Sequence, residues 1–65
     1  MLTNKQMLLM DKLKDLVKKE VIDDDTGLGL CLQLQENSQI DRMIEYLEKN
    51  PNAENDDILL FADTL

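Results

Sequence analysis

The chain has 65 residues, a formal net charge of −7, one cysteine and no histidine. One cysteine cannot form a disulfide within the chain, and without histidine a tetrahedral zinc site of nitrogen and sulfur ligands is not expected. A domain of this length buries only about 60% of the surface that its unfolded chain exposes. We therefore expect a single small domain over residues 1–65 that gains stability from association with another chain.

The charges are distributed unevenly along the chain. Residues 1–20 hold five of the seven basic residues, whereas residues 21–65 hold 11 of the 14 acidic ones. This excess of acid disfavours nucleic acid and favours either basic partners or simple solubility. The free cysteine and the absence of a signal-peptide pattern predict a cytoplasmic protein. The apolar runs are too short to predict a membrane span.

The first predicted element is a helix from Thr3 to about Ile22. Thr3 and Gln6 fit a capping box, in which each side chain accepts a hydrogen bond from the other residue's backbone N–H. Six apolar residues then fall on one wide helical face: Leu9, Met10, Leu13, Leu16, Val17 and Val21. Met7 and Leu8 lie outside that face.

Residues 28–35 are ambiguous between helix and strand. Their four leucines alternate with other residues, which is typical of a half-buried strand. The segment has no β-branched or aromatic residue, however, and leucine favours helix. We favour a central helix, buried all round, that starts at Asp25 or Thr26 after a turn at Asp23–Asp25. The alternative is an α+β fold in which this segment pairs as a strand between chains.

A buried central helix has two consequences for its side chains. Leu32→Ala is expected to cost roughly 2–5 kcal/mol of folding free energy. Cys31, which lies between leucines, is expected to be a small buried apolar residue rather than a reactive thiol.

Two further helices follow. Ser38 with Asp41 predicts the start of a helix that Pro51 ends, and Asn55 predicts the cap of the last helix. The third helix carries an apolar stripe of Ile40, Met43, Ile44 and Leu47, and the inner face of the last helix holds Ile58, Phe61, Ala62 and Leu65. Leu59 and Leu60 lie outside that inner face. The sequence therefore predicts an all-α fold, a compact bundle of three to four short helices.

One segment resembles a known family. The residues that carry the resemblance are Tyr46-Leu47, Asn50-Pro51, Ala53 and then Asp57-Ile58-Leu59. They are similar to the first two helices of winged-helix and helix-turn-helix domains, where such a turn leads into the helix before the recognition helix. The recognition helix would have to begin where this chain ends, at Leu65, and acidic residues crowd the region. We therefore do not expect direct DNA binding.

No catalytic or cofactor site is expected. The acidic run at Asp23 fails as a calcium-binding loop, because leucines occupy the positions of the required glycine and the final glutamate. Asp56 and Asp57 could in principle do acid–base work, but adjacent helical residues point to different sides and a chain this short offers no deep pocket. We predict a protein that is not an enzyme and binds no metal or cofactor.

The acidic residues suggest how the protein acts. Asp41, Glu45 and Glu48 follow helical spacing and form one stripe, and Glu54, Asp56 and Asp57 cluster at the start of the next helix. We expect this acidic face to bind a basic surface of a protein partner, as a regulator or inhibitor of the kind common in phages and mobile elements. The alternative is a self-associating structural protein, a homodimer formed through Met7, Leu8, Leu59 and Leu60.

Overall fold

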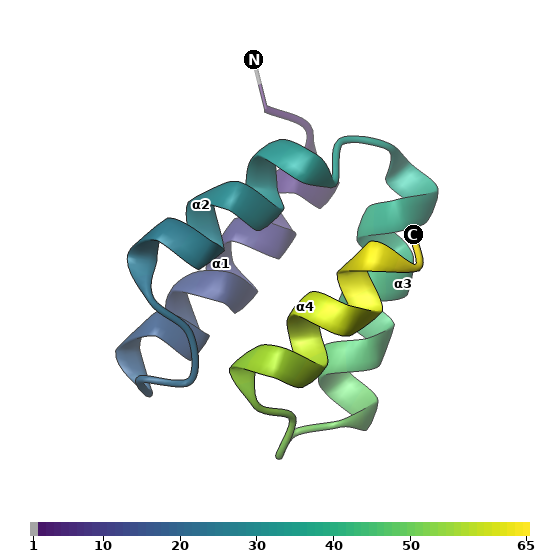
Figure 1. Ribbon diagram of the computed structural model, residues 1–65. Coiled ribbons are helices and arrows are strands. Elements are labelled where there is room, and N and C mark those ends of the chain that lie inside the picture. The colour runs from purple at the N-terminus through teal and green to yellow at the C-terminus, as the bar shows by residue number, and fades with distance from the viewer. Residues whose placement is uncertain (1) are drawn as a thin grey trace.

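A computed structural model describes residues 2–65, which form four helices and no strand (Figure 1). The helices are α1 (Asn4–Lys18), α2 (Asp24–Gln33), α3 (Asn37–Lys49) and α4 (Asn55–Asp63). The predicted all-α bundle is confirmed. The alternative strand at 28–35 is wrong, because most of that segment belongs to α2.

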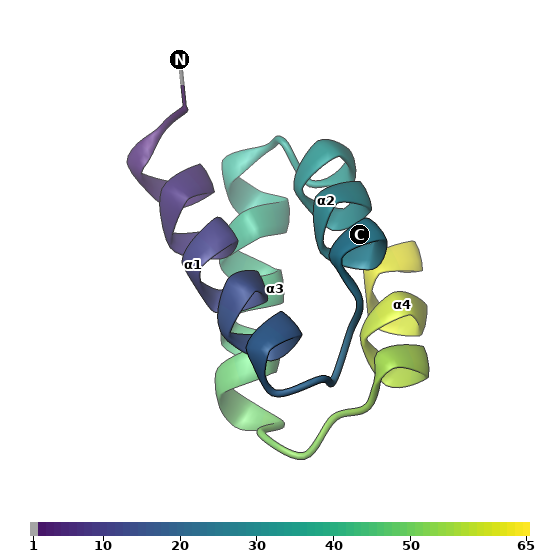
Figure 2. The same ribbon diagram turned by 90° about the vertical axis from the view of Figure 1, so that its left-hand side faces the viewer.

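The four helices form two antiparallel pairs joined through α1 and α3. α1 packs against both α2 and α3, and α4 packs mainly against α3 (Figures 1 and 2). The connections between α1 and α2 and between α3 and α4 therefore lie at the same end of the bundle, and the α2–α3 connection lies at the other (Figure 1). This topology brings two acidic segments together, as described below.

Every helix contributes to one apolar core. The buried side chains are Leu9, Leu13, Ile22, Leu30, Leu34, Ile40, Met43, Ile58 and Ala62. Tyr46 of α3 and Phe61 of α4 stack at the edge of this core, with ring centroids 4.1 Å apart and ring planes at 11°. Because aromatic pairs add stability beyond the area that they bury, this contact helps to fix α4 on α3.

The first helix ends earlier than predicted. Its capping box is present as expected, with Gln6 N–H donating to the Thr3 hydroxyl and Thr3 N–H donating to the Gln6 side chain. The helix stops at Lys18 rather than near Ile22, because Glu20 adopts the left-handed conformation with φ of 62°. Val21 N–H then donates to Leu16 C=O and Glu20 N–H to Val17 C=O, which is the Schellman arrangement that closes a helix.

The second helix begins earlier than predicted. Asp23 is its N-cap and accepts a hydrogen bond of 2.8 Å from Thr26 N–H, so Asp24 and Asp25 belong to the first turn rather than to a loop. This position suits carboxylates, since the N-terminal end of a helix carries partial positive charge. Hydrogen bonding from the Thr26 side chain, and then from its backbone N–H, lowers the pKa of Asp23.

The prediction that α2 is buried all round is wrong. Leu30 is only 2% exposed and Leu34 is fully buried, whereas Leu28 is 62% exposed and Leu32 is 63% exposed. α2 packs at the surface of the bundle, so only its inner face meets the other helices. The expected large cost of Leu32→Ala does not hold for a side chain that is mostly in water, and Cys31 is half-buried rather than buried.

The last two helices also begin one or two residues before their predicted caps. α3 has Glu36 as its N-cap instead of Ser38, with Glu36 N–H donating to the Gln39 side chain. α4 has Glu54 as its N-cap instead of Asn55, with Glu54 N–H donating to the Asp57 carboxylate. In both cases the side chain three residues into the helix satisfies the backbone, as in a capping box.

Alanine is expected to stabilise α2 at both of its glycines. A Cβ at Gly29 would meet nothing within 4 Å, and one at Gly27 would lie 3.6 Å from Val17 Cγ2, an ordinary contact distance. Because glycine loses more backbone entropy in a helix than alanine, Gly27→Ala and Gly29→Ala should each raise the free energy of unfolding by about 0.5–1 kcal/mol. Urea denaturation measures this, and a loss of stability in Gly27→Ala would mean that the α1–α2 packing is tighter than the structure indicates.

Candidate protein-interaction surfaces

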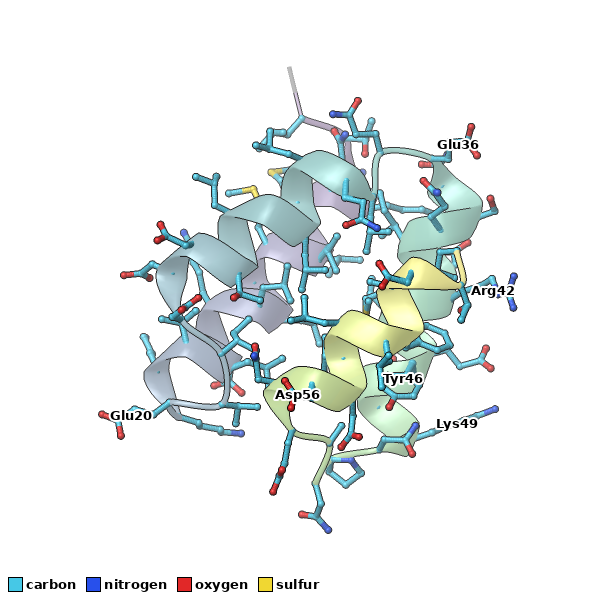
Figure 3. All side chains as sticks on the ribbon, viewed as in Figure 1. Glu20, Glu36, Arg42, Tyr46, Lys49 and Asp56 are labelled. Atoms are coloured by element: carbon cyan, nitrogen blue, oxygen red, sulfur yellow. The ribbon has the colours of Figure 1, made fainter. Side chains whose placement is uncertain are left out.

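Acidic residues from two distant parts of the chain meet at one end of the bundle. A shallow hollow there is lined by Glu20, Glu54 and Asp56, and an adjoining hollow by Glu20, Asp23 and Asp24. Figure 3 shows Glu20, in the connection between α1 and α2, and Asp56, in the first turn of α4, at this end. We call the seven acids of these segments the acidic end: Glu20, Asp23, Asp24, Asp25, Glu54, Asp56 and Asp57.

The acidic end is not neutralised by neighbouring lysines. Residues 2–65 contain three ion pairs, Lys5–Asp41, Lys19–Asp15 and Lys49–Glu45, and none involves a residue of the acidic end. All seven carboxylates belong to exposed residues. Half of the 14 acidic residues of the chain are therefore exposed at one end of the bundle, with no ion-pair partner among residues 2–65.

The predicted acidic stripe on α3 is more nearly balanced in charge. Asp41 lies 2.6 Å from the Lys5 ammonium group, and Glu45 lies 3.0 Å from that of Lys49. Glu48 belongs to none of the three ion pairs found in residues 2–65. Two of the three carboxylates of the stripe thus have a lysine partner, in contrast to the acidic end.

Of the predicted partner-binding residues, the structure groups some and separates others. Glu54, Asp56 and Asp57 belong to the acidic end, where the structure adds Glu20 and Asp23–Asp25. The latter residues were missed because their sequence pattern indicates only a turn and a helix start. Their proximity to the α4 start depends on the antiparallel pairing of helices, which no local pattern encodes.

A second surface lies between α1 and α2. Met10, Val17, Leu28 and Cys31 line a hollow of about 320 Å³, and the exposed side chain of Leu32 follows Leu28 by one helical turn. We call this surface the α1–α2 groove. It was not predicted, although Leu28 and Leu32 at i, i+4 spacing lie on a different helical face from Leu30 and Leu34, which is the signal that could have found it.

The predicted self-association residues are exposed but lie on separate helices. Met7, Leu8, Leu59 and Leu60 are all exposed, so each does lie outside the core. The first two belong to α1 and the last two to α4, and the main packing contacts of the bundle do not include α1 against α4. They therefore form two small patches rather than one.

The described part of the chain shows no cluster of metal-ligating side chains. Within residues 2–65 no three potential metal-ligating side chains gather at one point. Cys31 is a free thiol, and its partial burial raises its pKa, which lowers the fraction of reactive thiolate. None of the helices formed by these residues is long and apolar enough to span a membrane.

Comparison with known proteins gives no relative for this chain. No family model, no curated protein and no solved structure matches it. The resemblance of residues 46–59 to helix-turn-helix domains receives no support from these comparisons. Any functional conclusion must therefore be drawn from the surfaces themselves.

Proposed function

We propose that this protein is a non-catalytic, cytoplasmic interaction module that binds a basic surface of another protein through its acidic end. The observation that carries this proposal is the gathering of seven exposed carboxylates, none of them in an ion pair within residues 2–65, from two segments of the chain, residues 20–25 and 54–57. Occupying a basic surface would make the protein a regulator or inhibitor of its partner.

Electrostatics supports binding at the acidic end more than at the α3 stripe. A carboxylate that already has a lysine within 3 Å loses that ion pair when a cation of the partner replaces the lysine. The exchange therefore contributes little binding free energy. The unpaired carboxylates of the acidic end have no such cost. All of them except Glu20 lie at the starts of α2 and α4, and the mutual repulsion among them is relieved when a basic surface approaches.

Affinity capture with matched variants tests the proposal. One variant, Glu20→Gln/Asp24→Asn/Asp56→Asn, removes three charges from the acidic end without touching the cap residues Asp23 and Asp57. The control, Asp41→Asn/Glu45→Gln/Glu48→Gln, removes the same charge from the α3 stripe. We expect basic proteins captured from the native host by the wild-type chain to bind the first variant at least tenfold more weakly and the second with a smaller loss.

Salt dependence distinguishes a specific acidic surface from net charge alone. Wild-type binding should weaken steeply as ionic strength rises, and this slope should flatten in the acidic-end variant only. Equal losses in the two variants would mean that net charge, not the acidic end, attracts the partner. Capture of no basic protein by the wild-type chain would remove the proposal.

Self-association is a second candidate, favoured by the exposure of Met7, Leu8, Leu59 and Leu60. Exposed apolar patches of this kind can mark an interface between identical subunits, which would make the protein a structural or assembly module. Sedimentation equilibrium at tens of micromolar should then give a dimer. A monomer of 7.5 kDa at that concentration would exclude this candidate.

A further inference from the structure

We propose that the α1–α2 groove binds the apolar face of an amphipathic helix from another protein, and that carboxylates on the flank of this helix pair with Lys14 and Lys18. This surface adjoins the acidic end and shares Asp24 with it, but its apolar floor and its two lysines lie outside the acidic end, so the inference does not depend on the proposed function. It rests on three observations: the apolar floor of the groove, the positive charge of one rim, and the poor fit of the α2 of a second copy.

The floor of the groove is continuous and apolar. Met10 and Val17 of α1 face Leu28 and Cys31 of α2 across it. Beyond Cys31 it continues to a small hollow lined by Leu2, Leu9 and Leu34, and Met10 and Cys31 border both hollows. α2 has ten residues and is about 15 Å long, which matches three turns of a docked helix with apolar side chains at i, i+3 or i+4, and i+7.

Two leucines of α2 are exposed to water although the packing of the bundle does not require it. Leu28 and Leu32 are both more than 60% exposed, and no charged residue occurs between Thr26 and Gln35. A helix that covers the two leucines would bury apolar area that the bundle leaves exposed, which is the main source of affinity in helix-in-groove recognition.

The charges at the rim indicate the chemistry of the docked helix. Lys14 and Lys18 of α1 line the groove, both are exposed, and neither belongs to the three ion pairs found in residues 2–65. Asp24 lines the groove as well, at the start of α2. A docked helix with carboxylates on its α1 side, one turn apart, would pair with the two lysines, whereas a basic flank there would be repelled.

The α2 of a second copy fits the groove poorly. A twofold axis that pairs α2 with itself in parallel would bring Asp24 and Asp25 of both copies together. An antiparallel pairing would place these aspartates at the C-terminal end of the other α2, where the helix dipole is negative and the chain offers Gln33 and Gln35 instead of basic residues. Charge therefore disfavours the α2 of a second copy as the docked helix and favours a helix of different sequence.

Selection from a displayed peptide library tests the inference. The library consists of helical peptides with leucine fixed at i, i+3 and i+7 and with both flanks randomised among acidic, basic and neutral residues. We expect the peptides selected by the wild-type chain to carry aspartate or glutamate on one flank. Their affinity, measured by fluorescence anisotropy, should fall at least tenfold in Leu28→Ser/Leu32→Ser and in Lys14→Glu/Lys18→Glu.

Controls separate loss of the groove from loss of the fold. All four substituted residues are exposed, so circular dichroism should show an unchanged helix content, and Leu60→Ser, on α4, should bind the peptides as the wild type does. The inference is overturned by selected peptides with neutral or basic flanks, by unchanged affinity in either double variant, or by failure to select any binder. If the wild type forms a dimer and Leu28→Ser/Leu32→Ser abolishes it, a second copy of the chain covers the groove instead.

Discussion

Leu30→Ala is expected to destabilise the domain by about 2–5 kcal/mol, enough to unfold a large fraction of the molecules at room temperature. Leu30 is 2% exposed and packs with Leu34 into the core from the inner face of α2. Truncating a fully buried leucine removes its transfer free energy and leaves a cavity. A domain of 65 residues has only about 3–10 kcal/mol of stability in total, so one such cavity takes a large share of it.

Leu32→Ala is the matched control for this prediction. The same substitution two residues further along the same helix removes a side chain that is 63% exposed, and it should cost less than about 1 kcal/mol. Urea denaturation followed by circular dichroism measures both variants. Equal costs for Leu30→Ala and Leu32→Ala would contradict the orientation of α2, since only a helix buried on both faces would respond in that way.

Ile58→Ala is expected to detach α4 from the bundle, at a cost of about 2–5 kcal/mol. Ile58 and Ala62 are the only fully buried side chains of α4, which has nine residues and cannot remain helical by itself. The Tyr46–Phe61 stack contributes less than the lost isoleucine. Hydrogen exchange should show loss of protection at the amides of residues 58–65 that exceeds the loss in α1 and α3.

Leu60→Ala provides the comparison for α4. Leu60 is 67% exposed, so its truncation should leave both the stability and the exchange pattern of a monomer unchanged. If the amides of α4 kept their wild-type protection from hydrogen exchange in Ile58→Ala, this result would contradict the packing of α4 on α3 that the structure shows. A large loss of protection in Leu60→Ala would indicate that this leucine is covered in solution, as self-association requires.

The helices themselves could be predicted from the sequence because their apolar spacing is local information. The end of α1 could not, because the residue that adopts the left-handed conformation is Glu20 and not a glycine. The starts of α3 and α4 were placed one or two residues late for a related reason. Serine and asparagine are the preferred caps, and in this chain glutamates take their place, with the side chain at the third helical position satisfying the backbone.

The surfaces could be predicted only in part, since they depend on which helices become neighbours. The spacing of Asp41 and Glu45 indicates a negative stripe, but Lys5 is 36 residues away from Asp41 in sequence and its ion pair depends on α1 packing against α3. The acidic end likewise forms only when the α1–α2 and α3–α4 connections meet. For α2, the spacing separates the leucines into two faces, but it does not show which face meets water, because a helix with apolar residues on both faces looks the same whether it is central or peripheral.

Chemical-shift mapping by NMR tests the central claim, binding at the acidic end, most directly. The ¹⁵N-labelled chain is titrated with a helical peptide rich in lysine and arginine at low and at physiological ionic strength. We predict that the largest shift changes fall on residues 20–25 and 52–57, and that they shrink as salt increases. Larger changes on α3 at Asp41–Glu48, or changes spread evenly over all exposed carboxylates, would contradict the assignment of the acidic end as the binding surface.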